Sequence, residues 1–168
     1  SALTSSVVTT GSATYNFYYG NLHAHSGYSD GNKDNTSYTP ADDYAYAKNS
    51  LSMDFLGISE HNHSGAGMRL ADWAPGVAQA NAATNSSFVA LYGQEWGVIS
   101  NGGHVLIYGI DSLIGWESGN YQIYVPQSDY ISNTGLFRRL NLSPNAFATY
   151  AHPGGSDYDL SLIHISEP

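Results

Sequence analysis

The sequence predicts an α/β domain built around a largely parallel sheet or barrel. Five short apolar runs of strand length alternate with helical or loop segments, and this alternation favours parallel strand pairing. The chain has 168 residues, 42% of them hydrophobic, which is enough for one domain with a buried core. Because the C-terminal ends of barrel strands share one mouth, titratable residues at those ends are expected to meet. Four residues follow predicted strands in this way: His25, His61, Glu95 and His152.

Composition argues against several classes of function. Only five basic residues and a net charge of −9 argue against binding to nucleic acid or to anionic membranes. The absence of cysteine excludes a disulfide scaffold and a cysteine-ligated zinc site. No apolar run approaches the ~20 residues of a membrane span, so no membrane insertion is expected. Charged residues make up only 11% of the chain, and abundant Asn, Ser and Tyr favour a secreted or periplasmic protein.

The N-terminal part of the chain contains the first candidate metal ligands. Residues 1–13 are small and polar and predict a loose arm, and residues 15–25 predict an aromatic strand that runs into a loop. A strand presents His23 and His25 on one face, about 6.5 Å apart, which suits chelation of a metal ion. The turn at Ser29-Asp30-Gly31 can return a carboxylate to the same place. The ordinary alternative is a solvated strand end followed by an Asp-Gly turn.

The remaining elements follow from local signals. A helix is expected from Thr39 to Asn49, because Thr39 can cap it and Pro40 suits its first position. Pro75 is a possible start for a second helix that ends near Ala83. Further strands are predicted at residues 53–59, 88–92, 103–110 and 146–151, with Glu95 at the end of the strand at 88–92. An aromatic loop is expected at residues 112–127 and a short helix within residues 128–141.

Five short motifs occur in order between residues 21 and 153, and together they carry a family resemblance. They are His23-Ala24-His25 with Ser29-Asp30-Gly31, then Glu60-His61-Asn62, Gly93-Gln94-Glu95, a strand opened by His104, and Ala151-His152-Pro153. In this pattern the chain resembles the PHP (polymerase and histidinol phosphatase) superfamily of metal-dependent hydrolases. The stretch at residues 103–110 resembles the carbaryl-hydrolase-like, often secreted, branch of that superfamily.

The resemblance implies an incomplete, distorted β/α barrel with two to three divalent ions at the C-terminal ends of its strands. Imidazoles with a bridging carboxylate suit Zn²⁺, Mn²⁺ or Fe²⁺, and such ions lower the pKa of a bound water toward about 7. Glu95, His61 and Glu60 are the implied catalytic residues. The implied ligands are His23, His25 and Glu95 for one ion, Glu95, His104 and His152 for a second, and Asp30 and His61 for a third.

Two departures from the family pattern are visible. Glu60 stands where the family usually has Asp, and it is expected to orient His61 or the bound water. The family's closing Gly-x-Asp-x-His motif has no counterpart after His152, so the domain at residues 14–160 resembles a C-terminally truncated form. Two ions would then lack one ligand each, and such a chain could be inactive. Residues 161–168 look foreign to the family and are expected to be a non-native tail.

The expected function is a hydrolase that uses a metal-activated water. A cationic metal site favours an anionic substrate, so a phosphoester is the first substrate hypothesis. Lys33 and Arg69 follow metal-binding strands and Trp96 adjoins Glu95, which makes these three the candidate substrate contacts. The scarcity of basic residues leaves open a carboxyl ester or carbamate. A non-catalytic metal-binding surface module is the alternative from another class, and the oligomeric state is not predicted.

Overall fold

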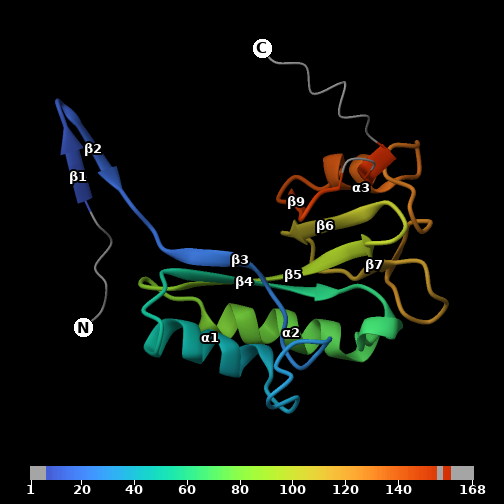
Figure 1. Cartoon of the computed structure of the whole chain (residues 1–168), viewed down its shortest axis with the longest axis horizontal. Helices are drawn as coiled ribbons and strands as arrows, with labels where there is room; N and C mark the ends of the chain where they lie inside the picture. The colour runs from blue at the N-terminus through green and yellow to red at the C-terminus, as the bar shows by residue number, and fades with distance from the viewer. Residues whose placement is uncertain (1–6, 155–156, 160–168) are drawn as a thin grey trace.

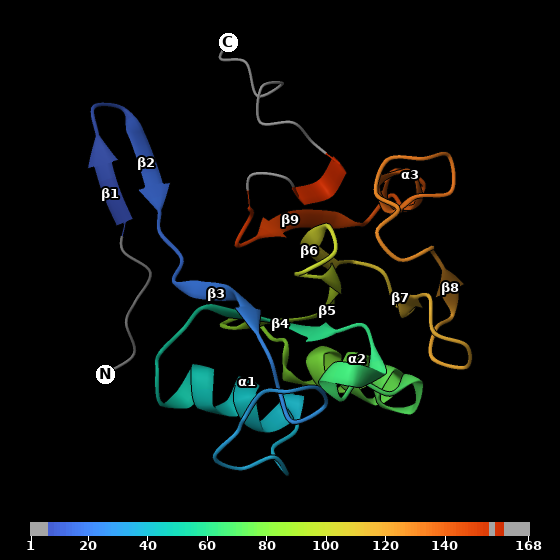
Figure 2. The ribbon, with the colours of Figure 1, turned by 45° about the vertical axis from the view of Figure 1, so that its right-hand side comes forward.

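The computed structural model describes residues 7–154 and 157–159, and its centre is a five-stranded mixed sheet. The strands lie in the order β3 (Gly20–Ala24), β4 (Phe55–His61), β5 (Val89–Val98), β6 (Gly103–Tyr108) and β9 (Phe147–Ala151). Strands β3, β4 and β5 are parallel, whereas β6 is antiparallel to both of its neighbours. The sheet curls into a half-barrel (Figure 2). The α/β class is therefore confirmed.

The expectation of a largely parallel sheet is wrong for the second half of the sheet. Residues 99–102 alone connect β5 to β6, and so short a connection can join only antiparallel strands. The same pairing lengthens β5 beyond the predicted end, because Gln94 to Val98 pair with residues of β6. Glu95 therefore lies inside β5 and not at its end.

Two helices cover one face of the sheet, and they lie side by side (Figure 1). Helix α1 (Pro40–Asn49) has the predicted bounds, and the Asp42 carboxylate accepts hydrogen bonds from the N–H and the hydroxyl of Thr39. Helix α2 (Leu70–Ala83) begins five residues before Pro75, so Pro75 lies inside the helix and the predicted start is wrong. The helix begins after Arg69, whose side chain makes no capping hydrogen bond, and local sequence therefore carries little signal for this start.

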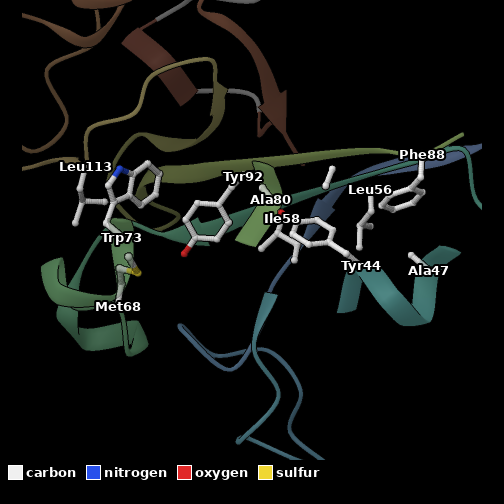
Figure 3. Close-up of a cluster of buried hydrophobic side chains, with 11 residues drawn as sticks. Tyr44, Ala47, Leu56, Ile58, Met68, Trp73, Ala80, Phe88, Tyr92 and Leu113 are labelled. Carbon is white, nitrogen blue, oxygen red and sulfur yellow. The ribbon is translucent and has the colours of Figure 1, made fainter. Parts of the chain in front are cut away.

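The main hydrophobic core lies between these helices and the sheet (Figure 3). Trp73 of α2 packs on Tyr92 of β5, with 5.1 Å between ring centroids. The hydroxyl of Tyr44 donates to the carbonyl of Leu91 at 2.8 Å, which ties α1 to the sheet. Gly76 allows α2 to approach closely, because a Cβ there would lie 2.1 Å from Cζ of Tyr92.

A second core covers the β5–β6 end of the same face with the chain between residues 110 and 140. Two short strands lie there, β7 (Ile114–Gly115) and β8 (Ile123–Tyr124), inside the predicted aromatic loop. Helix α3 (Leu136–Asn141) is the predicted short helix. Trp96 and Tyr130 are fully buried in this core. Single 3₁₀ turns lie at η1 (Ser64–Ala66) and η2 (Asp157–Asp159).

The N-terminal segment differs from the predicted arm and long strand. Strands β1 (Val7–Thr10) and β2 (Ala13–Asn16) form an antiparallel hairpin that projects from the body of the molecule (Figure 1). Residues 17–19 are not in a strand, so the predicted strand at 15–25 is divided into β2 and β3. The predicted tail at 161–168 lies outside the described residues. Among the helices of the described part, none is long and apolar enough to cross a membrane.

Candidate metal centre

The predicted metal ligands lie together along one edge of the five-stranded sheet, the edge that is formed by the ends of its strands. The parallel strands β3, β4 and β9 end at this edge, and the antiparallel strand β6 begins there. His61 pairs with Glu95, and His104 pairs with Gly97, which is two residues after Glu95 in β5. The side chains of His61, Glu95 and His104 therefore lie on one face of the sheet. We call the gathered residues the Glu95 cluster: His23, His25, Asp30, His61, Glu95, His104 and His152.

The carboxylate of Glu95 is the centre of the cluster and its side chain is only 1% exposed. One oxygen, Oε1, lies 2.7 Å from Nδ1 of His104 and 3.0 Å from Nε2 of His152. The other oxygen, Oε2, lies 3.0 Å from Nε2 of His25, 3.3 Å from Nε2 of His23 and 3.5 Å from Nδ1 of His61. Both oxygens therefore face imidazole nitrogens from several strands, as a bridging carboxylate would.

Burial and mutual contact set the protonation of these groups. Burial alone would raise the pKa of Glu95, but hydrogen bonds from His104, His23 and His25 hold it far below its usual range. Burial lowers the pKa of His61, and the neighbouring His25 adds to this effect. Burial also disfavours the cation of His25, but its hydrogen bond to Glu95 raises the pKa overall. The site thus presents an ionised carboxylate and a neutral His61, the forms that bind metals.

Asp30 lies on the outer side of the cluster. Its Oδ1 is 3.5 Å from Nε2 of His61 and 4.0 Å from Nδ1 of His25, and its side chain is 49% exposed. The two nitrogens of His61 therefore face two different carboxylates, Asp30 and Glu95. Within the described residues, three overlapping groupings could hold a metal ion: His23, His25 and Glu95; His25, Asp30 and His61; and His61, Glu95 and His104.

The donor set fits divalent metal ions better than it fits hydrogen bonds alone. Nε2 of His23 and Nε2 of His25 are 3.3 Å apart, and Nδ1 of His104 and Nε2 of His152 are 3.4 Å apart. Nδ1 of His61 is buried and has no hydrogen-bond partner among the described residues. Such convergent nitrogens suit an ion that accepts several lone pairs at once.

Glu60 supports the cluster from the opposite face of β4. It is fully buried, and its carboxylate accepts hydrogen bonds from the N–H of Ser26 at 3.1 Å and from the hydroxyls of Ser26 and Ser29. Oγ of Ser29 lies 3.4 Å from Nδ1 of His25. The expectation that Glu60 orients His61 is therefore not supported, because adjacent strand residues point to opposite faces. Glu60 is instead connected to His25 by Ser29, whose hydroxyl contacts both side chains.

The three candidate substrate contacts are not gathered with the cluster. Trp96 has no exposed surface, because it points to the face opposite Glu95 and packs on Trp116 and Tyr130. Arg69 is exposed, but its Nη1 donates to the carbonyls of residues 64, 67 and 68, so it organises its own loop. Lys33 lies exposed in the loop after Asp30.

His63 lies beside the cluster, although the five sequence motifs do not include it. It is half-buried, and its ring stacks on that of Trp116 with 6.0 Å between the centroids. The rings of His63 and His61 are 5.7 Å apart. A second His-x-His spacing, at His61 and His63, was the available signal. His63 belongs to none of the three ligand groupings found among the described residues.

Comparisons with protein-family models, with curated proteins and with solved structures found no match for this chain.

Proposed function

We propose that this chain is a metal-dependent hydrolase of the PHP type, with two to three divalent ions held by the Glu95 cluster. The observation that supports this proposal is the convergence of five imidazoles on the single buried carboxylate of Glu95. Bound divalent ions would supply Lewis acidity and an activated water. The half-barrel, with its ligands at one edge of the sheet, is consistent with a distorted β/α barrel.

The residues of the chain divide the remaining work. Glu95 would hold two ions close together, because its two oxygens face different histidines, two at Oε1 and three at Oε2. Glu60 and Ser29 would fix the ring of His25 from behind. The hydroxyl of Ser29, which lies beside His25, donates to the buried carboxylate of Glu60 and is assigned a supporting role, so direct attack by a metal-activated water is the proposed reaction.

A phosphoester is the proposed substrate, because two or three divalent ions outweigh the two carboxylates of the cluster. A carboxyl ester or carbamate is the second candidate. The observation that favours it is the engagement of Arg69 with backbone carbonyls, which leaves few cations to hold a phosphate. A secreted or periplasmic location remains part of this proposal, as the composition favours it.

The first test is the metal content of the chain, purified without added metal and measured by elemental analysis. His152→Ala is the informative variant, because its side chain is 44% exposed and truncation leaves no buried cavity. His63→Ala is the matched control, because its ring lies 5.7 Å from that of His61 but forms no ion pair with a carboxylate of the described residues, whereas Nε2 of His152 lies 3.0 Å from Oε1 of Glu95. Wild type and the control should retain zinc, manganese or iron, and His152→Ala should lose at least one ion.

Turnover then separates the candidate functions. The metal-loaded protein is assayed with p-nitrophenyl phosphate and with p-nitrophenyl acetate. Hydrolysis of the phosphate would support the phosphoesterase, and hydrolysis of the acetate alone would support the second candidate. Retained metal without turnover of either ester would favour the non-catalytic metal-binding module. Absence of any retained or added metal at the cluster would overturn the proposed centre.

A further inference from the structure

Of the two histidines at the β6–β9 end of the cluster, His104 lies in an interior strand, whereas His152 follows an edge strand and has little support from the sheet. Strand β9 lies at the edge of the sheet, with β6 as its neighbour, and four of its five residues are exposed. His152 follows the end of β9 with a positive φ of 34°, a backbone conformation that is unfavourable for a side chain other than glycine. Its ring nevertheless reaches Glu95 at 3.0 Å. Some further contact must hold this end of β9 in place.

Tyr158 makes that contact. Its hydroxyl lies 2.8 Å from the carbonyl oxygen of His104 and 2.9 Å from the carbonyl oxygen of Ala151, the residue before His152. His104 and Ala151 are partners in the β6–β9 pairing, at the edge where the cluster lies. One phenol therefore joins the backbones that carry two of the cluster's histidines.

The side chain of Tyr158 is itself firmly placed. It is 3% exposed, it stacks on Tyr150 at 4.3 Å, and it meets Tyr130 edge-on at 5.6 Å. Its backbone N–H donates to the carbonyl of Gly102 at 2.7 Å. Burial raises the pKa of Tyr158 to about 12, so the phenol keeps the proton that it donates.

The backbone around this contact is shaped for it. Tyr158 has a φ of 64°, which is uncommon for a residue other than glycine. Gly103 has a φ of 94°, and a Cβ there would lie 2.8 Å from Cβ of Asp157 and 2.9 Å from Cε1 of Tyr158. The carboxylate of Asp157 also accepts a hydrogen bond from the N–H of Gly154, two residues after His152. The close fit of η2 on the start of β6 and the end of β9 therefore depends on Gly103.

We propose that Tyr158 is a positioning residue of the metal centre, which sets the spacing between the rings of His104 and His152. This inference rests on the proposed function, because it concerns ligands of the same cluster. Nδ1 of His104 and Nε2 of His152 lie 3.4 Å apart and both face Oε1 of Glu95. Loss of the hydroxyl frees the end of the edge strand, so the two nitrogens would no longer be held ready for one ion.

The test compares Tyr158→Phe with Tyr150→Phe. Both changes remove one hydroxyl from the same ring stack, and Tyr150 is 47% exposed. Zinc affinity of the whole chain is measured by competition with a chromophoric chelator, and the visible spectrum of the cobalt-loaded protein reports the ligand geometry. Circular dichroism confirms that both variants are folded, which is expected because phenylalanine keeps the ring.

Tyr158→Phe should weaken zinc binding about tenfold and change the cobalt spectrum, as expected for the loss of a group that orients ligands. Tyr150→Phe should bind zinc within about twofold of the wild type. Equal zinc affinity and identical cobalt spectra in the two variants would overturn the role of Tyr158 and leave the metal centre intact. A wild-type chain that binds none of zinc, cobalt, manganese and iron would overturn the proposed function, and this inference with it.

Discussion

Glu95→Gln is the variant that most directly tests the centre of the cluster. Glutamine keeps the size of the side chain, but it replaces a charged bridging carboxylate with a neutral amide. Zinc at one hundred times its dissociation constant stabilises a folded protein by about 2.7 kcal/mol. For a chain of 168 residues, about 2–4 °C per kcal/mol converts this to a rise in Tm of about 5–11 °C.

The variant should lose nearly all of that rise. A hundredfold weaker affinity would leave about 0.4 kcal/mol of stabilisation at the same zinc concentration, or about 1–2 °C. Differential scanning fluorimetry with and without zinc measures both shifts. Binding of zinc to unfolded chains does not explain the difference, because both proteins contain the same seven histidines.

Glu117→Gln is the control for this experiment. The Glu117 carboxylate accepts a hydrogen bond from the N–H of Ser64 at 2.8 Å and lies outside the ligand groupings of the described chain. It should show the full wild-type rise in Tm. A rise in Glu95→Gln as large as that of the wild type would refute the reasoning, as would a wild type whose Tm does not respond to zinc, manganese or iron.

Two further predictions concern the scaffold beneath the cluster. Burial raises the pKa of Asp43 to about 6, although the hydrogen bond from Asn32 opposes this shift. The native state therefore binds more protons than the unfolded state in this range, and the free energy of unfolding falls as the pH rises from about 4 to about 6. In urea unfolding at pH 7.5, the free energy of unfolding of Asp43→Asn should therefore be about 1–2 kcal/mol higher than that of the wild type, and at pH 4 the two should be equal. An equal difference at both pH values would contradict this. Gly76→Ala should lower the free energy of unfolding by about 1–3 kcal/mol in thermal unfolding, because the added Cβ would overlap the ring of Tyr92. This loss is expected although alanine favours helices over glycine by about 1 kcal/mol. An unchanged Tm would show that the ring can move.

Local sequence signals predicted the elements that local interactions determine. Helix α1 begins at Thr39-Pro40 as expected, because the capping contacts lie within four residues. The antiparallel return of β6 was missed, although Asn101-Gly102-Gly103 is a turn signal between two apolar runs. The start of α2 was also missed, since Arg69 is not a preferred capping residue.

The sequence was enough to identify which residues are candidate ligands, but not to predict the contacts that hold them in place. His23 and His25 are two positions apart at the end of β3, and the sequence shows this spacing directly. The partners of Glu60 are Ser26 and Ser29, more than 30 positions away in a loop without a regular pattern. Tyr158 reaches His104 across 54 positions. Such contacts depend on the curl of the sheet, which no local pattern records.

The antiparallel strand explains why His104 can join a site built from the ends of parallel strands. In an all-parallel sheet, a residue at the start of a strand would lie at the opposite edge from the strand ends. Because β6 runs backwards, its second residue lies beside Gly97 and Ala151, at the edge where β4 and β9 end. The reversal of one strand therefore adds a candidate ligand that an all-parallel sheet would have to take from a loop.

Charge within the site and charge on the surface have opposite consequences for substrate choice. The chain carries a net charge of −9, but exposed charges are screened beyond about 8–10 Å at physiological salt. The Glu95 cluster contributes two carboxylates, so two divalent ions would leave it with a net charge of about +2, and three with about +4. Attraction of an anionic substrate would therefore depend on how many ions the cluster holds. An acidic surface is thus compatible with a phosphoesterase, provided that the ions are bound.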